Sequence, residues 1–205
     1  MLKVTRAGMY TSVQDAGRGG LRQFGVSRCG ALDKPALVTA NLLVGNDANA
    51  AALEITLGMA TFTFVLEGWF ALTGAGCEAT LDGEAVWSGW RHWAKAGQTL
   101  TLKRPKHGIR SYLALSGGID VPAVMGSRST DLNVGVGGFE GRCLQDGDVL
   151  PLGRPVRTFR EPRGIKPLIA SNRIRALPGP EYHEFDATSQ ETFWRSPWQL
   201  SPQSN

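Results

Sequence analysis

A glycine-rich stretch in the second half of the chain, GSRSTDLNVGVGGFEGR from Gly126 to Arg142, has the composition of an anion-binding loop. Glycines allow successive backbone N–H groups to converge on one anion, and the forked guanidinium groups of Arg128 and Arg142 suit a carboxylate or a phosphate. Both arginines are therefore candidate substrate-binding residues. The same composition also suits a structural corner of a β-barrel with both arginines in water, and the sequence leaves the two interpretations open.

Specific nucleotide-binding motifs are not found in this stretch. A Walker-type loop, G-x-x-x-x-G-K-[ST], needs a lysine that follows no glycine pair here. The dinucleotide fingerprint G-x-G-x-x-G also fails, because Gly135 and Gly137 are followed by Glu140 at the third position. No G-x-S-x-G elbow marks a serine as a nucleophile. The sequence therefore predicts no conventional nucleotide site in this loop.

A second polar cluster, TSVQDAGRGG, lies near the N-terminus, where Gln14, Asp15 and Arg18 occupy a glycine-flanked turn. In a structural interpretation, Asp15 holds its own turn through an Asx hydrogen bond to the backbone. In a functional interpretation, Asp15 and Arg18 present a charge pair to a carboxylate or amide substrate. Both interpretations fit the sequence.

Cysteines and histidines do not form a metal-binding pattern. Cys29, Cys77 and Cys143 are odd in number and never occur in a C-x-x-C spacing, and the three histidines include no i, i+4 pair. The sequence therefore predicts neither a disulfide framework nor a metal site.

Composition and charge place the chain among globular proteins. Its 205 residues, 42% of them hydrophobic, suffice for one large domain or two small ones. The net charge is +4, but the basic residues lack the interleaved aromatic residues of a nucleic-acid platform, so no nucleic-acid partner is predicted. No window approaches the ~18 apolar residues of a membrane span, and the N-terminus does not resemble a signal peptide. We expect a cytoplasmic protein without membrane association.

Short β-branched and aromatic runs separated by glycines predict a mainly β fold. Strands are expected on both sides of Glu67-Gly68 within residues 60–74, around a hairpin at Asp82-Gly83, and over residues 98–103 and 109–115. One helix is predicted in KPALVTANLLVG, where Asp33 caps the first turn and Gly45 follows the last. These elements indicate a β-barrel or sandwich with a packed helix.

The chain is expected to divide into a first domain over residues 1–155, a linker over 156–167 and the beginning of a second domain over 168–205. The arginine- and proline-rich segment RPVRTFREPRGIKP marks the linker, and SNRIRALPGPEYHEF begins like a strand. The last segment cannot enclose its own aromatic side chains, because units below about 40 residues need an additional support. These side chains are Phe185, Phe193, Trp194 and Trp198.

Short sequence blocks recur along the whole chain in a fixed order. They are Thr11–Asp15 with Gly17-Arg18, Ser27–Asp33, Ala40–Asn46, Leu53–Thr56, Leu72–Ala75, Arg110–Ala114 with Gly117-Gly118, Gly126–Thr130, Gly137-Gly138, Gly141-Arg142 and Gly147-Asp148. In these blocks the chain resembles the biotin-dependent carboxyltransferase family, whose members include subunits of 5-oxoprolinase, allophanate hydrolase subunit 2 and KipA-like regulators. Within the family, the blocks are most similar to those of enterobacterial members.

The resemblance implies a cyclophilin-like β-barrel for the first domain and the start of a related second barrel after the linker. In the family, the second domain continues with a motif like S-x-R-M-G-x-R-L after the position of residues 203–205. The resemblance therefore implies a C-terminally truncated family member. A half-built barrel exposes strand edges and apolar faces, so we expect the chain to self-associate or to retain a partner.

The resemblance further implies an ATP-dependent 5-oxoprolinase, which opens 5-oxo-L-proline to L-glutamate. In such an enzyme this chain is one of three components, with the B component as its direct barrel partner and the A component as the third, and the chain alone is expected to be inactive. The chemistry requires groups that bind a carboxylate or phosphate and groups that handle protons. Arg18, Arg128 and Arg142 are candidates for the first role, and Asp15 and Asp33 for the second.

Two alternative functions stay open at this point. The first is the carboxyltransferase half of a urea amidolyase-type system, in which biotin on a carrier would be the cofactor. The second is a KipA-like regulator that binds a kinase inhibitor and turns over no substrate. ATP belongs to the main interpretation, and no location for its site follows from the sequence.

Overall fold

The computed structural model describes residues 1–166 and 175–199. The chain divides into unit 1, Met1–Pro167, and unit 2, Leu168–Asn205. Unit 1 is built from strands and one α-helix, α1 (Lys34–Leu43). The strands are β1 (Leu2–Arg6), β2 (Tyr10–Gln14), β3 (Ala52–Thr56), β4 (Thr61–Phe64), β5 (Gly68–Gly74), β6 (Cys77–Leu81), β7 (Glu84–Val86), β8 (Trp90–Ala94), β9 (Thr99–Pro105), β10 (Arg110–Leu115), β11 (Val149–Leu150) and β12 (Arg163–Gly164).

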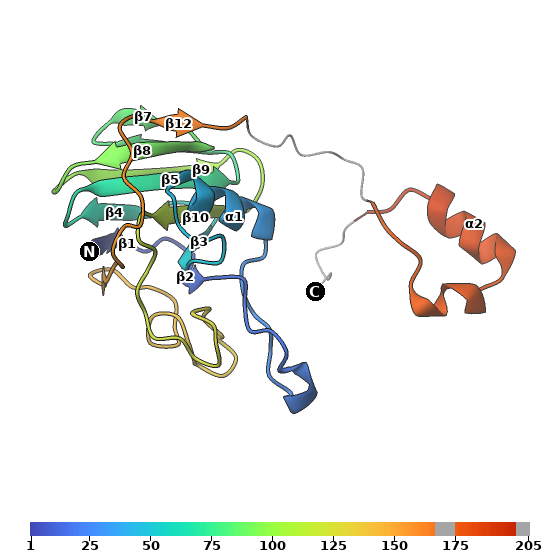
Figure 1. Cartoon of the computed structure of the whole chain (residues 1–205). Coiled ribbons are helices and arrows are strands. Elements are labelled where there is room, and N and C mark those ends of the chain that lie inside the picture. The colour runs from blue at the N-terminus through green and yellow to red at the C-terminus, as the bar shows by residue number, and fades with distance from the viewer. Residues whose placement is uncertain (167–174, 200–205) are drawn as a thin grey trace. The chain divides into compact units, whose positions relative to one another are not determined.

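Two antiparallel sheets form unit 1 (Figure 1). The first sheet has the order β11-β1-β4-β9-β6-β7, and the second has the order β12-β8-β5-β10-β3-β2. The turn expected at Glu67-Gly68 carries the chain from β4 in the first sheet to β5 in the second. The mainly β fold predicted from the sequence is therefore confirmed.

The main hydrophobic core of unit 1 draws on strands of both sheets. Leu2, Phe62 and Leu100 come from the first sheet, and Phe70 and Leu113 come from the second. All five side chains are fully buried. Alternation of side chains along each strand places the apolar set in this core, and the removal of apolar surface from water is the main force that stabilises it.

Helix α1 packs on the second sheet and forms a second apolar cluster there (Figure 1). Leu37 and Ala40 of the helix are buried in one cluster with Trp69 and Tyr112 of the sheet. The Asp33 side chain accepts a hydrogen bond of 3.1 Å from the backbone N–H of Ala36, as expected for an N-cap. The predicted helix and its cap are therefore confirmed.

The predicted hairpin at Asp82-Gly83 joins β6 and β7. Asp82 and Gly83 have φ values of 50° and 92°. Positive φ at both central residues is the requirement of a type I′ turn, whose twist matches that of the paired strands.

Part of the segment expected to be a linker packs on unit 1. Within residues 156–167, β12 pairs with β8, and the Phe159 ring lies 3.7 Å from the guanidinium carbon of Arg91. These contacts use one strand edge and one partly buried cation, which an arginine- and proline-rich composition does not reveal.

Unit 2 contains the 3₁₀ helix η2 (Pro180–Glu184) and the helix α2 (Ala187–Arg195). Asp186 caps α2 by accepting a 2.8 Å hydrogen bond from the Ser189 N–H. The strand-like start expected over residues 171–185 lies partly outside the described residues, and residues 175–185 contain η2 and no strand. The second barrel stays a prediction.

Two long connections extend from one end of the sheets (Figure 1). The arm, residues 17–30, follows β2 and carries the short 3₁₀ helix η1 (Arg22–Phe24). The glycine loop, residues 126–142, lies between β10 and β11 and contains only isolated bridges such as Asp131↔Val136. Among the described residues, no helix has the length and apolar character that crossing a membrane requires.

Candidate functional site

Asp15 joins the end of β2 to the glycine loop. Its carboxylate accepts hydrogen bonds from Ser127 Oγ at 2.7 Å, Ser129 Oγ at 2.6 Å and the backbone N–H groups of Arg128 at 2.6 Å and Gly17 at 2.8 Å. Burial of Asp15 alone would raise its pKa, but these hydrogen bonds hold the pKa below its ordinary value. The carboxylate is therefore an ionised group that organises the loop.

Arg18 lies at the base of the arm and reaches under the same loop. Its backbone N–H donates to the Arg28 carbonyl at 2.7 Å, and its Nη2 donates to the Ser129 carbonyl at 2.8 Å. The residue is 2% exposed. Within the described part of the chain, Nε and Nη1 have no hydrogen-bond partner. Arg18 and Asp15 thus share Ser129 as a neighbour, and only Asp15 has its polar atoms satisfied.

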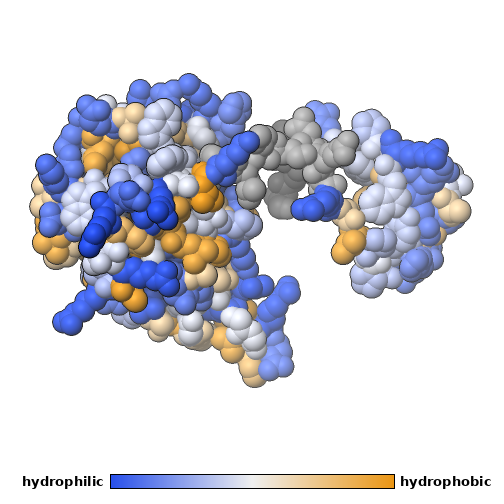
Figure 2. All heavy atoms as spheres, turned by 45° about the horizontal axis from the view of Figure 1, so that its top comes forward, coloured by the Kyte–Doolittle hydropathy of each residue, from blue (hydrophilic) through white to orange (hydrophobic). Residues whose placement is uncertain are grey.

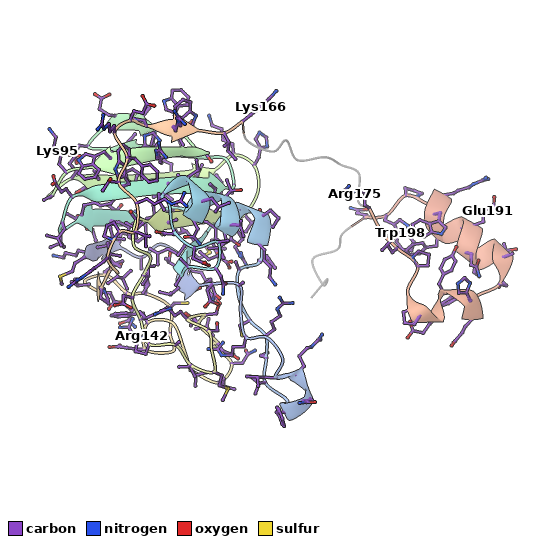
Figure 3. All side chains as sticks on the ribbon, viewed as in Figure 1. Lys95, Arg142, Lys166, Arg175, Glu191 and Trp198 are labelled. Atoms are coloured by element: carbon purple, nitrogen blue, oxygen red, sulfur yellow. The ribbon has the colours of Figure 1, made fainter. Side chains whose placement is uncertain are left out.

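Arg128 and Arg142 are already engaged by protein groups. Arg128 Nε donates to the Val121 carbonyl at 2.7 Å, and its Nη2 lies 3.5 Å from an Asp120 oxygen. Arg142 holds Asp148 in a forked pair of 2.7 and 3.0 Å, which together with Glu140 raises the pKa of the guanidinium. Arg142 lies among the loops at the end of unit 1 (Figure 3).

Asp33 belongs to a separate hydrogen-bond network with residues of the second sheet. Its backbone N–H donates to the Tyr112 hydroxyl at 2.7 Å, and that hydroxyl donates to Glu54 Oε2 at 2.6 Å. Leu32 N–H and Arg110 Nε also donate to the Glu54 carboxylate, at 2.9 and 3.1 Å. Burial, together with the bond to Glu54, raises the pKa of Tyr112. The phenol therefore stays protonated and acts as a hydrogen-bond donor.

The structure brings some of the five sequence-predicted site residues together. Asp15, Arg18 and Arg128 meet around residues 127–129, and the Ala31 N–H links the Asp15 carbonyl to the segment that leads to Asp33. Arg142 belongs to a different ion pair of the loop region. Sequence reasoning did not single out Glu54 and Tyr112. Their signal was a polar group among the buried residues of these strands, at positions paired across β3 and β10.

Gly137 and Gly138 explain part of the glycine content of the loop. A Cβ on Gly137 would collide with the Ser129 carbonyl and Arg18 Nη2, and a Cβ on Gly138 would collide with the Thr130 side chain. Both residues have positive φ. Close packing against residues 129 and 130 therefore requires glycine here. Among the residues described, no group of three or more His, Cys, Asp or Glu side chains is arranged to hold a metal ion.

The family model for the carboxyltransferase domain, subdomains A and B, matches residues 24–205. The chain belongs to this carboxyltransferase-domain family. The resemblance of the short sequence blocks is thereby confirmed, and the glycine loop lies wholly within the matched residues.

Several carboxyltransferase-domain relatives match the whole chain. It is 71% identical over 205 residues to the C component of 5-oxoprolinase from Escherichia coli and 42% identical to the C component from Haemophilus influenzae. In both cases the match covers 100% of this chain and 66% of the relative. The chain thus spans slightly less than two thirds of the length of these relatives.

A solved structure of the family shows the same fold. The crystal structure of the K. lactis urea amidolyase matches with a TM-score of 0.87 at 32% identity, over 100% of this chain and 13% of the amidolyase. The urea amidolyase of Saccharomyces cerevisiae is 35% identical over 217 residues, which cover 100% of this chain and 12% of that protein. The domain therefore occurs both in a subunit of about one and a half times this length and within a much longer chain.

Proposed function

We propose that this chain is part of one component, C, of an ATP-dependent 5-oxoprolinase, which opens 5-oxo-L-proline to L-glutamate. The observation that carries the proposal is the 71% identity to the C component of E. coli 5-oxoprolinase over all 205 residues. Urea amidolyase matches are weaker, at 35% and 36% identity.

The residues around the glycine loop suit the proposed substrate. 5-Oxoproline carries a carboxylate beside a lactam N–H, so a site for it needs a cation and a hydrogen-bond acceptor. Within the described residues, Arg18 offers unpaired guanidinium N–H groups, whereas Arg142 is committed to Asp148. The ionised Asp15 fits a positioning role in this proposal, because its oxygens already accept hydrogen bonds from the loop.

The proposal includes two further protein components and ATP. The B component is proposed as the direct partner of this barrel, and the A component as the third member of the complex. Apolar side chains reach the surface of unit 1 in patches between hydrophilic ones (Figure 2), and exposed Trp87, Trp90 and Trp93 offer contact area for a protein partner. A cytoplasmic location is part of the same proposal.

Reconstitution tests the proposed function. The full-length protein that contains this chain would replace the C component in a mixture with the A and B components of E. coli 5-oxoprolinase, and glutamate release from 5-oxoproline would be measured with and without ATP. We expect release that depends on ATP and on all three components. No release, under conditions in which the E. coli C component is active, would contradict the proposal.

A carboxyl-transfer reaction with carboxybiotin is the second candidate function. It is favoured by the TM-score of 0.87 to the K. lactis urea amidolyase. Under this alternative, biotin on a separate carrier would be the cofactor, and the family members would share a cleft for it. Transfer of a labelled carboxyl group from carboxybiotin to urea by the full-length protein would support this candidate over the first.

A further inference from the structure

The guanidinium group of Arg18 is a buried cation of unit 1 whose bonding capacity is largely unused. A guanidinium has five N–H donors in a fixed plane. The Ser129 carbonyl takes one of them, at Nη2, and among the described residues Nε and Nη1 have no partner. A charged group that is 2% exposed and incompletely bonded is strongly unfavourable unless an anion or ordered water completes its shell.

The donors that remain on Arg18 form a complete fork. Nη2 carries two hydrogens, one beside Nε and one beside Nη1. Whichever of them the Ser129 carbonyl takes, the other hydrogen lies parallel to the N–H of a neighbour, Nε or Nη1, that is unpaired within the described residues. Two parallel N–H groups match the two oxygens of a carboxylate. The unpaired edge of Arg18, although buried, therefore has the donor geometry that matches one planar anion.

Three other arginines of unit 1 have carboxylate partners on the protein. Arg142 pairs with Asp148, Arg110 with Glu54 and Arg128 with Asp120. In the described ranges 1–166 and 175–199, no ion pair within 4.0 Å involves Arg18. The counter-ion of Arg18 is thus expected to come from a bound molecule.

Surrounding backbone holds the Arg18 side chain in place. Gly17 packs so closely on the carbonyls of Arg28 and Cys29 that a Cβ there would collide with both. On the other side, Gly137 leaves room for Nη2 itself. A receptor group fixed in this way loses little conformational entropy when an anion binds.

Gln14 supplies an acceptor from the neighbouring turn. Its Nε2 donates to the Thr130 carbonyl at 3.3 Å, and a flipped amide would place two acceptor oxygens against each other. In this orientation Oε1 is left buried without a partner among the described residues. Gln14 and Arg18 thus bind the same segment, through the successive carbonyls of Thr130 and Ser129.

We propose that Arg18 is the receptor for the carboxylate of a small ligand, and that Gln14 Oε1 accepts an N–H next to that carboxylate. The ligand class is an α-amido carboxylate. Its identification as 5-oxoproline rests on the proposed function, whereas the anion site rests on Arg18 alone.

The Nε–H resonance of Arg18 gives a direct test. The ¹⁵N-labelled chain would be titrated with 5-oxoproline, with 2-pyrrolidinone, which has the lactam but no carboxylate, and with inorganic phosphate. The Arg18 resonance is assigned by correlation to its backbone, so the titration does not depend on a variant. We expect this resonance to shift with 5-oxoproline and to stay in place with 2-pyrrolidinone.

Two matched variants test whether binding depends on the paired N–H donors of Arg18 or only on its positive charge. Arg18→Lys keeps the charge and loses the fork, and we expect it to weaken 5-oxoproline binding about 30-fold or more. Arg91→Lys is the control, because Arg91 on β8 is partly buried and bonded to the carbonyls of Glu161 and Leu43. That variant should bind as the parent chain does. The lactone analogue, with a ring oxygen for the N–H, should bind about 10-fold more weakly because Gln14 then lacks its donor.

An Arg18 resonance that does not move with 5-oxoproline, or that moves equally with 2-pyrrolidinone, would overturn the proposal. A response to phosphate alone would overturn the carboxylate assignment. The reconstitution assay and the titration can fail separately. An active complex together with an Arg18 resonance that does not shift would contradict only the role of Arg18 as the carboxylate receptor. An inactive complex together with an Arg18 resonance that shifts would contradict only the 5-oxoprolinase function.

Discussion

Asp15 is the residue on which the geometry of the glycine loop depends most. Its four hydrogen bonds come from Gly17 in its own turn and from residues 127–129 of the glycine loop. The Asx bond to Gly17 N–H was one of the two interpretations that the sequence allowed, and the structure contains it. The bonds to the serines span more than a hundred residues, and no local pattern predicts them.

Asp15→Asn should destabilise the chain by about 2–4 kcal/mol at neutral pH, because an amide cannot accept all of these hydrogen bonds. The folded-state pKa of Asp15 lies below its unfolded value. Its contribution is therefore complete above the unfolded pKa of about 4 and is lost as the pH falls through the folded pKa. Urea denaturation between pH 3 and 7 would measure the difference in the free energy of unfolding between Asp15→Asn and the parent chain. We expect this difference to be about constant above pH 5 and smaller below pH 4.

Asp120→Asn provides the control for the titration of Asp15. Asp120 is an exposed carboxylate that pairs with Arg128 at 3.5 Å. Its substitution should change the free energy of unfolding by less than about 1 kcal/mol. A difference between Asp15→Asn and the parent chain that did not shrink in acid would contradict the assigned role of the carboxylate.

At the scale of the elements, the glycine loop keeps its shape through two kinds of glycine. Gly135 and Gly137 have similar φ values, 68° and 71°. A Cβ on Gly135 meets nothing within 4 Å, whereas a Cβ on Gly137 meets Ser129 and Arg18. The first glycine therefore provides backbone freedom alone, and the second also provides space.

Gly135→Ala should cost about 1–2 kcal/mol, the penalty of a left-handed conformation. Gly137→Ala should carry the same penalty and should also make the new Cβ collide with fixed backbone. We therefore expect its free energy of unfolding to be lower than that of Gly135→Ala by about 1 kcal/mol or more, as at other overpacked sites. Thermal or urea unfolding of the two variants would compare them. Equal losses would show that the Gly137 contact does not constrain the loop.

Sequence patterns predicted the elements unevenly. The hairpin at Asp82-Gly83 and helix α1 follow from local chemistry, a turn dipeptide and an N-cap. Strands β1 and β2 were not predicted, although Leu2 and Val4 alternate with exposed residues in β1. Strand β12 depends on an available edge of β8, which is a property of the fold rather than of its own sequence.

At the scale of the whole molecule, unit 2 has an exposed aromatic cluster. Phe193 lies 5.1 Å between ring centroids from both Trp194 and Trp198, and these rings line a cavity of about 590 Å³. Trp198, which lies beside α2 (Figure 3), is 72% exposed. An aromatic cluster of this kind favours contact with another protein surface.

We predict that the 205-residue chain self-associates through this cluster. Sedimentation velocity over a range of concentrations should show a mass that rises with concentration, and Trp198→Ser should reduce the rise. Trp87→Ser, at a similarly exposed tryptophan in unit 1, is the control. A monomer at every concentration would contradict the prediction.

The family, unlike the site, was accessible from the sequence. Short blocks such as Ser27–Asp33 and Gly126–Thr130 carry the family resemblance in the sequence itself. The unused fork of Arg18 could not be predicted, because it depends on which carbonyls and carboxylates reach the guanidinium in three dimensions.

ATP-dependent release of glutamate from 5-oxoproline, with the full-length protein in place of the C component beside the E. coli A and B components, tests the central claim most directly. The account predicts release only when ATP and all three components are present. Absence of release, while the E. coli C component is active in the same mixture, would contradict it.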